Sequence, residues 1–394
     1  MKVVAARPAA IWSTLALSLA VAAAPAGSAL AEDNAADAWP TYLHDYQRSG
    51  QTTAELPMPL AAAWVYHARH APAPAWPPPA QQDFWHNKFN LKARVTYDRA
   101  MHVVSDGRRC YFGSSADDAV RCLDLATGKT LWSYFAEAPV RLAPTISGER
   151  IYFGSDDGTA VCLEATDGRL VWRRRIADVD RRLPGNQRMI SAAPVRTDLL
   201  VEEGQIRLGA GLFPSQGAYQ VLLDAKTGEV VARGEVDFSP QGYLHLVGDR
   251  LLTGQGRAPD ALLAQMTRRG AEPAQPIAPD SFDPALSLVQ VATGAHVIAG
   301  GENRVAAFDR KTGKAVWTAE VEGGAWSLAI AAGRLLVSTD AGKIYCFAAA
   351  PENADPQKPA IATGPAAIEP LEDAAARRVA KELLAASGAE QGWC

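Results

Sequence analysis

The chain has 394 residues, of which 48% are hydrophobic and 21% charged, and its formal net charge is −4. This length allows a sizeable buried core, and the mild acidity argues against a general nucleic-acid-binding protein. Five cysteines are present without Cys-x-x-Cys spacing, so the sequence indicates no thiolate metal site.

Residues 1–31 have the features of a secretory signal peptide. Lys2 and Arg7 form a positively charged start, residues 9–24 are almost wholly apolar, and Ala29-Leu30-Ala31 fits a cleavage site. Cleavage changes the formal charge from −4 to −6. No other run approaches the roughly 20 apolar residues of a membrane helix. We therefore expect an exported protein, periplasmic or extracellular, without a transmembrane segment after cleavage.

Residues 32–60 are interpreted as a polar N-terminal leader, and the run 61–67 that follows is β-like. Residues 70–91 are rich in proline, which cannot donate hydrogen bonds to a strand ladder. We therefore expect an irregular loop over one mouth of the fold. The aromatic side chains Trp76 and Trp85 in this loop have two interpretations. They form a hydrophobic plug, or they contact a ligand or partner.

The clearest copy of an internal repeat covers residues 151–172, IYFGSDDGTAVCLEATDGRLVW. Its first apolar run ends at Gly154. The turn Asp156-Asp157-Gly158 follows, because Asp tolerates turn geometry and Gly accepts positive φ. A second turn at Gly168 opens a third run that ends at Trp172. With residues 142–147 as a further strand, the unit is predicted to be a four-stranded antiparallel sheet.

The repeat recurs along the chain. Its copies align at six positions that lie 39 to 57 residues apart, namely 113, 154, 211, 254, 300 and 339. A period of roughly 40–45 residues with four strands per unit is typical of a β-propeller. We therefore predict an all-β fold over residues 61–350, a propeller of six four-stranded blades. Residues 257–283 are rich in proline and show no clear strands, so the sequence also allows a seventh blade there.

The last repeat, residues 326–348, contains three strands and lacks the final turn and strand. The run 61–67 carries Trp64 and is similar to the missing strand. We predict that it pairs with the strand containing Tyr345 and closes the ring, which removes exposed sheet edges.

The repeat resembles a known family. An acidic residue, two variable residues and Thr-Gly-Lys-x-x-Trp, after a Tyr-x-Gly-Ser-x-Asp-Gly turn, are similar to the pyrroloquinoline-quinone (PQQ) type of propeller repeat. This family includes quinoprotein alcohol dehydrogenases and the noncatalytic propeller of the BamB-type outer-membrane assembly factor. The similar region runs from Trp39 to Ala350. The repeat positions are Gly113, Gly128, Gly154, Gly168, Gly228, Gly313, Trp132, Trp172 and Trp317.

The resemblance implies two different functions. A quinoprotein dehydrogenase would use PQQ with Ca²⁺, and many such enzymes carry an adjacent pair of cysteines, which this sequence lacks. The BamB-like branch implies a noncatalytic scaffold that binds proteins or peptides at a propeller face, without cofactor, metal or catalytic residues. We favour the scaffold, and the dehydrogenase and a glycan-binding module are the alternatives. The repeat tryptophans are expected to pack blade against blade.

An inserted segment before the third blade carries four polar residues of interest, Arg181, Arg182, Asn186 and Arg188. Guanidinium groups suit carboxylate and phosphate ligands, so this loop is a candidate ligand or partner site. The alternative is a solvated loop whose arginines pair with the aspartates of the same segment.

Three of the cysteines, Cys122, Cys162 and Cys346, occupy the same position in different repeats. There they are expected to act as small buried hydrophobic residues. Cys110 lies on a strand next to that of Cys122, so a disulfide between these two residues is left open.

Residues 351–371 are rich in proline and predict a linker. Residues 372–394 contain an amphipathic helical pattern from Asp373 to Ser387, stopped by Gly388. A lone helix of about 15 residues is marginal in water, so it docks on the propeller rim or begins a truncated second domain. The pattern resembles the entry to a class I S-adenosylmethionine-dependent methyltransferase domain. That reading would make the chain the front part of a larger protein.

Overall fold

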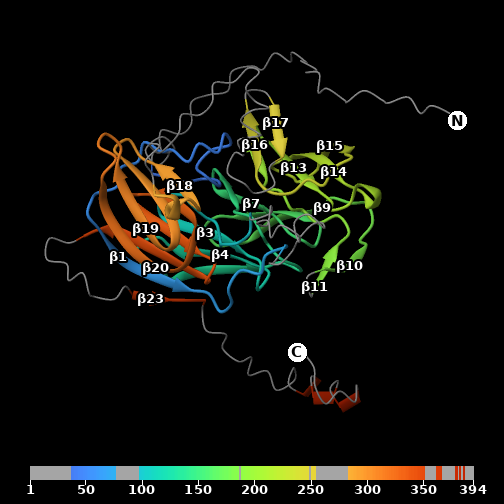
Figure 1. Ribbon diagram of the computed structural model, residues 1–394. Helices are drawn as coiled ribbons and strands as arrows, with labels where there is room; N and C mark the ends of the chain where they lie inside the picture. Colours follow the sequence, from blue (N-terminus) through green and yellow to red (C-terminus); the bar gives the residue numbers. More distant parts are fainter. Residues whose placement is uncertain are drawn as a thin grey trace, which may run out of the picture.

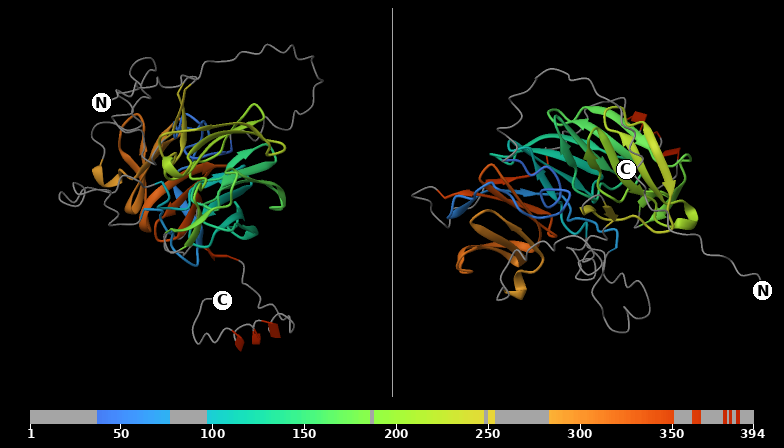
Figure 2. Two further views of the ribbon diagram at one scale, coloured as in Figure 1. Left: turned by 90° about the vertical axis from the view of Figure 1, so that its right-hand side faces the viewer. Right: turned by 90° about the horizontal axis from the view of Figure 1, so that it is seen from above.

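The computed structural model describes residues 37–76, 97–185, 188–247, 250–253, 283–350 and 361–365, and six helical residues between 378 and 386. Apart from those helical residues and two short 3₁₀ helices, Pro214–Gln216 and Pro284–Leu286, the described elements are β-strands. The antiparallel sheets follow one another around the molecule in chain order (Figure 1 and Figure 2). The expected signal peptide lies outside the described residues.

Three antiparallel four-stranded sheets repeat the predicted unit, and these sheets are blades of a β-propeller. The first contains β2 (Val103–Ser105), β3 (Arg109–Ser114), β4 (Ala119–Asp124) and β5 (Thr130–Phe135). The second contains β6 (Thr145–Ser147), β7 (Arg150–Gly154), β8 (Thr159–Glu164) and β9 (Leu170–Arg175). The third contains β12 (Leu200–Glu202), β13 (Gln205–Ala210), β14 (Tyr219–Asp224) and β15 (Val230–Glu235).

The remaining strands form a pair, a hairpin and a larger sheet. The pair is β16 (Leu244–Val247) with β17 (Arg250–Thr253), and the hairpin is β10 (Arg182–Gly185) with β11 (Arg188–Ser191). The seven-stranded sheet has the order β18 (Val289–Ala292), β19 (His296–Asp309), β20 (Ala315–Ala331), β21 (Arg334–Thr339), β22 (Lys343–Ala349), β1 (Leu60–His67) and β23 (Ile361–Thr363).

The long strand β20 explains why two repeats merge in the larger sheet. Its first half pairs with β19, and its second half, from Ala325 to Ala331, pairs with β21. The last strand of one repeat thus runs on as the first strand of the next. Residues 254–282 lie outside the described residues, so six or seven blades stays a prediction.

The strand predicted to complete the last repeat does so. β1 pairs antiparallel with β22, with Trp64 opposite Cys346 and Val65 opposite Tyr345. The indole Nε1 of Trp64 donates to the carbonyl oxygen of Leu125, at 3.0 Å, in the sheet of β2 to β5. β1 therefore joins the last described repeat to the first.

Two repeat tryptophans make the same contact between other neighbouring sheets. Trp132 Nε1 donates to Ala165 O at 3.2 Å, and Trp172 Nε1 donates to Ala225 O at 3.1 Å. In both cases the indole belongs to the outer strand of one sheet and the acceptor to the next. Trp317 Nε1 donates to Leu60 O at 2.8 Å, but these two residues lie on β20 and β1 of the same seven-stranded sheet.

The indole rings pack so closely on the turns that only glycine fits beneath them. A Cβ at Gly128 would lie 2.5 Å from the ring of Trp64, and at Gly168 it would lie 2.6 Å from the ring of Trp132. Gly228 has the same relation to Trp172, at 2.6 Å. These glycines also have φ between +70° and +71°, a region that side chains with a Cβ rarely adopt. Each turn glycine and the indole that faces it therefore form a single packing contact.

The leader has a role that the sequence did not reveal. Residues 37–52 run past five sheets and contact the seven-stranded sheet at two places, on β18 and after β20. Their hydrogen-bond partners in these sheets, or next to them, are Ser105, Ile146, Val201, Leu246, Ala292 and Ala332. The leader thus ties together one end of the sheets, which we call the turn end because the turns around Gly128 and Gly168 also lie there.

The structure answers the open question of a cysteine pair and adds a strand within the expected linker. Cys110 and Cys122 are free. Cys110 lies opposite Leu123 and Cys122 opposite Tyr111, so the two thiols point to opposite faces of the sheet and cannot pair. The expected linker 351–371 contains strand β23, which pairs in parallel with β1 through Ile361, Ala362 and Thr363.

The C-terminal helical residues lie apart from the sheets in Figure 1 and Figure 2. Val379, which the sequence pattern places on the apolar face, is 49% exposed. Arg378 and Glu382 form an i,i+4 ion pair at 3.8 Å. Docking of this segment on the rim is therefore not seen.

We expect Trp172→Ala to lower the free energy of unfolding by roughly 3–5 kcal/mol, because it removes a buried indole and leaves a cavity. Urea unfolding followed by circular dichroism would measure this change. Leu170→Ala, two residues away and 43% exposed, is the matched control and should change stability little. Equal stability of Trp172→Ala and wild type would contradict the inter-sheet role.

Candidate functional site

Four charged residues form a buried network at the opposite end of the sheets, which we call the loop end. There the second strand of each sheet connects to the third, and the chain passes to the next sheet. Arg141 precedes β6, Asp156 follows β7, Arg196 precedes β12, and Asp98 lies before β2. Each of these residues is at most 5% exposed.

The network is neutral, and its contacts are short. Arg141 donates from Nε to Asp156 Oδ2 at 2.7 Å and from Nη1 to Asp98 Oδ2 at 2.9 Å. Arg196 donates from Nε and Nη2 to the two oxygens of Asp156, at 2.8 and 2.9 Å. Each arginine is thereby neutralised by a carboxylate, which burial of a charge requires.

The two aspartates differ in their electrostatic balance. Burial alone would raise the pKa of Asp156, but the guanidinium groups of Arg141 and Arg196 outweigh it and lower that pKa. Burial raises the pKa of Asp98, and the attraction of Arg141 does not fully offset it. Within the described part of the chain, Asp98 Oδ1 also has no hydrogen-bond partner. Asp98 is therefore the member of the network with unused acceptor capacity.

Residues 71–76 cover this network. Arg141 Nη1 donates to Ala73 O at 2.7 Å, and Ala75 N donates to Asp98 Oδ2 at 2.7 Å. The Trp76 indole donates to Gln241 Oε1 at 3.1 Å. This segment therefore closes the loop end of the sheets, as the leader closes the turn end.

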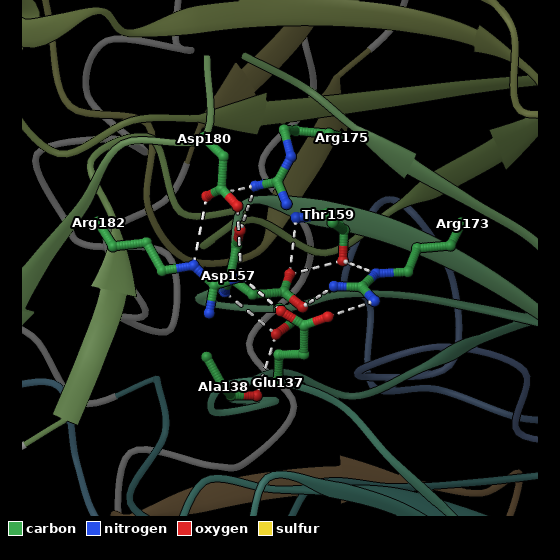
Figure 3. A network of polar contacts seen from close by, with 9 residues as sticks. Glu137, Ala138, Asp157, Thr159, Arg173, Arg175, Asp180 and Arg182 are labelled. Carbon is green, nitrogen blue, oxygen red and sulfur yellow. Dashed lines mark hydrogen bonds and ion pairs between the residues drawn. The ribbon is translucent and has the colours of Figure 1, made fainter. Parts of the chain in front are cut away.

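A second network lies next to the first and closer to solvent (Figure 3). Arg173 donates to Glu137 at 2.7 Å and to Asp157 at 2.9 Å. Arg182 also donates to Glu137, and it shares Asp180 with Arg175. Hydrogen bonds from Arg173 and Arg182 lower the pKa of Glu137 to about 2. Three arginines thus balance three carboxylates.

A third cluster fills the space between the two closing segments. Arg48 of the leader forms an ion pair with Asp198, and both side chains are fully buried. Tyr42 stacks on Tyr243 with 3.7 Å between ring centroids, and His102 meets Tyr42 edge to face at 4.9 Å. Burial lowers the pKa of His102 to about 4. This histidine is therefore neutral at pH 7.

The arginines predicted as a candidate site are paired rather than free. Arg188 donates to Asp118 at 2.5 Å, and Arg181 donates to Gln216 at 3.2 Å. Arg182 belongs to the network of Figure 3. Asn186 and Trp85 lie outside the described residues. Trp76 belongs to the segment that covers the buried network, and its indole donates to Gln241.

The repeat positions lie elsewhere. The indoles of Trp132 and Trp172 contact neighbouring sheets, and that of Trp317 contacts Leu60 within its own sheet. The turn glycines Gly128, Gly168 and Gly228 lie beneath indoles at the turn end. Gly313 has the same positive φ, +68°. None of these residues contacts the buried network through a described hydrogen bond.

Sequence reasoning missed Arg141 and Arg196, although a signal was present. Both end the same four-residue string, Ala-Pro-Val-Arg, at 138–141 and 193–196. The valine of each string packs on a repeat glycine, since a Cβ at Gly113 would lie 2.7 Å from Val140 and one at Gly154 2.3 Å from Val195. The arginine then points to Asp156. A search for repeats outside the strands would have found this pair.

The described residues do not fit a quinone–calcium site at this network. No group of three or more His, Cys, Asp or Glu side chains in the described ranges could hold a metal ion. The carboxylates of PQQ would need cationic partners, whereas Arg141 and Arg196 are already bound to aspartates. We therefore derive no redox step from these residues.

A family model described as outer membrane protein assembly factor BamB matches residues 77–257 and 301–353, more than half of the chain. The chain belongs to this family.

The curated relatives of this BamB-family chain include quinoprotein dehydrogenases. The quinoprotein ethanol dehydrogenase of Pseudomonas aeruginosa is 27% identical over 180 residues, which cover 41% of this chain and 26% of that enzyme. The quinoprotein alcohol dehydrogenase PedH of Pseudomonas putida is 26% identical over 209 residues, 50% of this chain and 33% of PedH. The similarity therefore spans a third or less of these relatives' lengths.

Two solved structures are similar at low identity. The quinohemoprotein alcohol dehydrogenase from Comamonas testosteroni has a TM-score of 0.38 and 16% identity, covering 76% of this chain and 46% of its own. BamB from Moraxella catarrhalis has a TM-score of 0.29 and 14% identity, covering 63% and 84%. Among the described residues, no helix has both the length and the hydrophobicity to cross a bilayer.

We expect Asp156→Ala to destabilise the protein by about 3–5 kcal/mol, because it leaves two buried guanidinium groups without their shared carboxylate. Thermal and urea unfolding would measure the change. Asp180→Ala is the control, since the side chain of Asp180 is 42% exposed and an exposed ion pair contributes little. If both variants unfold alike, the buried network is not a stabilising feature.

We expect stability to fall as the pH drops from 6.5 towards 4, in part because of His102. Its pKa is about 4 in the folded protein and near 6.5 when unfolded, so the unfolded chain binds the proton first. The contribution is complete above pH 6.5 and changes by about 1.4 kcal/mol per pH unit within the window.

The measurement is urea unfolding at several pH values between 7 and 4. His102→Asn should show a shallower loss of stability over this range than wild type, whereas substitution of the exposed His67 should not. A wild-type slope that persists in His102→Asn would contradict the assignment.

Proposed function

We propose that the chain is an exported, noncatalytic propeller that acts as a scaffold for protein interaction or assembly. The family to which the chain belongs is named for an assembly factor of outer-membrane proteins. The observation that carries the proposal is the self-contained buried network at the loop end. Its arginines and Asp156 are bound to one another and covered by residues 71–76, so a reacting group or a charged cofactor finds no free partner among them.

The proposed architecture is one closed ring of six blades over residues 61–350, after a signal peptide at 1–31. Two contacts support closure. β1 completes the sheet of β22, and the Trp64 indole reaches Leu125 in the first sheet. The leader is consistent with this count, because residues 37–52 bond to five sheets, one of which, the seven-stranded sheet, contains two merged repeats. A rigid ring of this kind presents constant surfaces, as a scaffold requires.

A second candidate is a quinoprotein dehydrogenase-like oxidoreductase. The sequence similarity to quinoprotein ethanol dehydrogenase favours it, at 27% identity over 180 residues. Such an activity would need PQQ with Ca²⁺ held by residues other than the described network.

Equilibrium dialysis of the mature protein with PQQ and Ca²⁺, together with a dye-linked alcohol oxidation assay, separates the two candidates. We expect neither stoichiometric quinone binding nor turnover. A matched quinoprotein alcohol dehydrogenase in the same assays is the positive control. Stoichiometric binding of PQQ would overturn the noncatalytic proposal.

Deletion of the gene tests the scaffold directly. We expect a lower content of folded outer-membrane proteins, restored by the wild-type gene. Unchanged outer-membrane protein content with a loss of alcohol oxidation would favour the dehydrogenase instead.

A further inference from the structure

Residues 71–76, Ala-Pro-Ala-Pro-Ala-Trp, sit on the loop end in the way that a bound peptide would. Ala73 uses both of its main-chain groups, since its N–H donates to Ser115 Oγ at 3.0 Å and its carbonyl accepts from Arg141. The N–H of Ala75 donates to Asp98, and the indole of Trp76 donates to Gln241. The protein thus recognises an extended backbone and one aromatic side chain.

The residues that receive this segment form a built site. The side chains of Arg141 and Asp98 are 3% and 1% exposed, and Ser115 is 4% exposed. Gln241 is also held in place, because its Oε1 accepts from Tyr97 OH at 2.9 Å and its Nε2 donates to Ser239. These residues come from different parts of the chain, and their positions do not depend on residues 71–76 alone. Arg141 in particular is fixed from its other side by Asp156.

One acceptor in this site has no donor among the described residues. Asp98 Oδ2 takes hydrogen bonds from both Ala75 and Arg141, whereas no described residue donates to the buried Asp98 Oδ1. A buried carboxylate oxygen without a donor is unfavourable. The intramolecular segment therefore satisfies this site incompletely, and an extended segment with a further donor could bind it better.

We propose that the loop end is a recognition site for an extended, alanine- and proline-containing segment of a partner protein that carries a tryptophan. In the free protein, the chain's own residues 71–76 occupy this site. The proposal rests on the proposed scaffold function and specifies how a partner would engage it. The partner segment must displace residues 71–76, which are tethered next to the site at an effective concentration on the order of millimolar. Binding is consequently weak until that segment leaves.

The test uses a fluorescent, amidated peptide with the sequence of residues 70–76, His-Ala-Pro-Ala-Pro-Ala-Trp, and fluorescence anisotropy. The protein is the mature chain with residues 71–76 replaced by Gly and Ser at equal length. We expect the peptide to bind this variant at least tenfold more tightly than it binds the wild-type chain.

Two control peptides separate specific binding from a general affinity for hydrophobic peptides. Ala75→Pro removes the N–H that Asp98 accepts, and Trp76→Ala removes the indole that donates to Gln241. Each change should weaken binding about tenfold, the effect of losing one such hydrogen bond with its contacts. On the protein side, Ser115→Ala should weaken binding by a smaller factor.

If the Gly/Ser replacement prevents folding, the double variant Ala75→Pro/Trp76→Ala in the full chain keeps the contacts of Ala73 and gives the same comparison. A folded variant with no peptide binding, or equal binding of all three peptides, would overturn this site. Such a result would leave the scaffold proposal standing, because the quinone and deletion experiments test that proposal separately.

Discussion

Neighbouring sheets are held together by an indole that lies flat against a glycine turn. The constraint is steric on both sides, because a Cβ at Gly128, Gly168 or Gly228 would come within 2.6 Å of the facing ring. The same indole donates a hydrogen bond to the carbonyl three residues before that glycine, so it contributes both apolar burial and a satisfied polar group. A residue of another shape would open a gap along the whole interface. The turn glycines and the tryptophans that face them therefore express one packing requirement, which recurs at Trp64 with Gly128, Trp132 with Gly168 and Trp172 with Gly228.

That lateral packing alone would leave both ends of the space between the sheets open, and two segments of the chain close them. The leader bonds to the first strands at the turn end, and Arg48 extends from it to Asp198 in the interior. Residues 71–76 close the loop end through Arg141 and Asp98. The enclosed aromatic residues Tyr42, Tyr243 and His102 are thus kept from solvent. The two segments therefore lie at opposite ends of the described sheets.

The sheets could be predicted because their pattern is local and repeated. Copies of the repeat lie 39 to 57 residues apart, and β1 could be placed because the last repeat lacked one strand. The leader could not be predicted in this way, since its partners are main-chain groups spread from Ser105 to Ala332 and carry no side-chain signature. β23 has only three residues in a proline-rich stretch, so it has no periodicity to detect. The buried network could be predicted only in part. The duplicated Ala-Pro-Val-Arg string was visible, but only distance in space shows that both arginines share Asp156.

The arrangement of charge at the loop end favours recognition over catalysis. A catalytic group needs a donor or acceptor that is free to contact a substrate. Arg141, Arg196 and Asp156 instead use their hydrogen-bonding groups on one another. The charges of the network in Figure 3 also balance one another. Mutual neutralisation instead fixes the side chains, so that Arg141 and Asp98 present one donor and one acceptor at a constant separation. Such a pair matches the carbonyl and N–H groups of an extended chain, which every peptide offers. Selectivity must then come from what surrounds the pair, namely the Gln241 acceptor for an indole and the unused oxygen of Asp98.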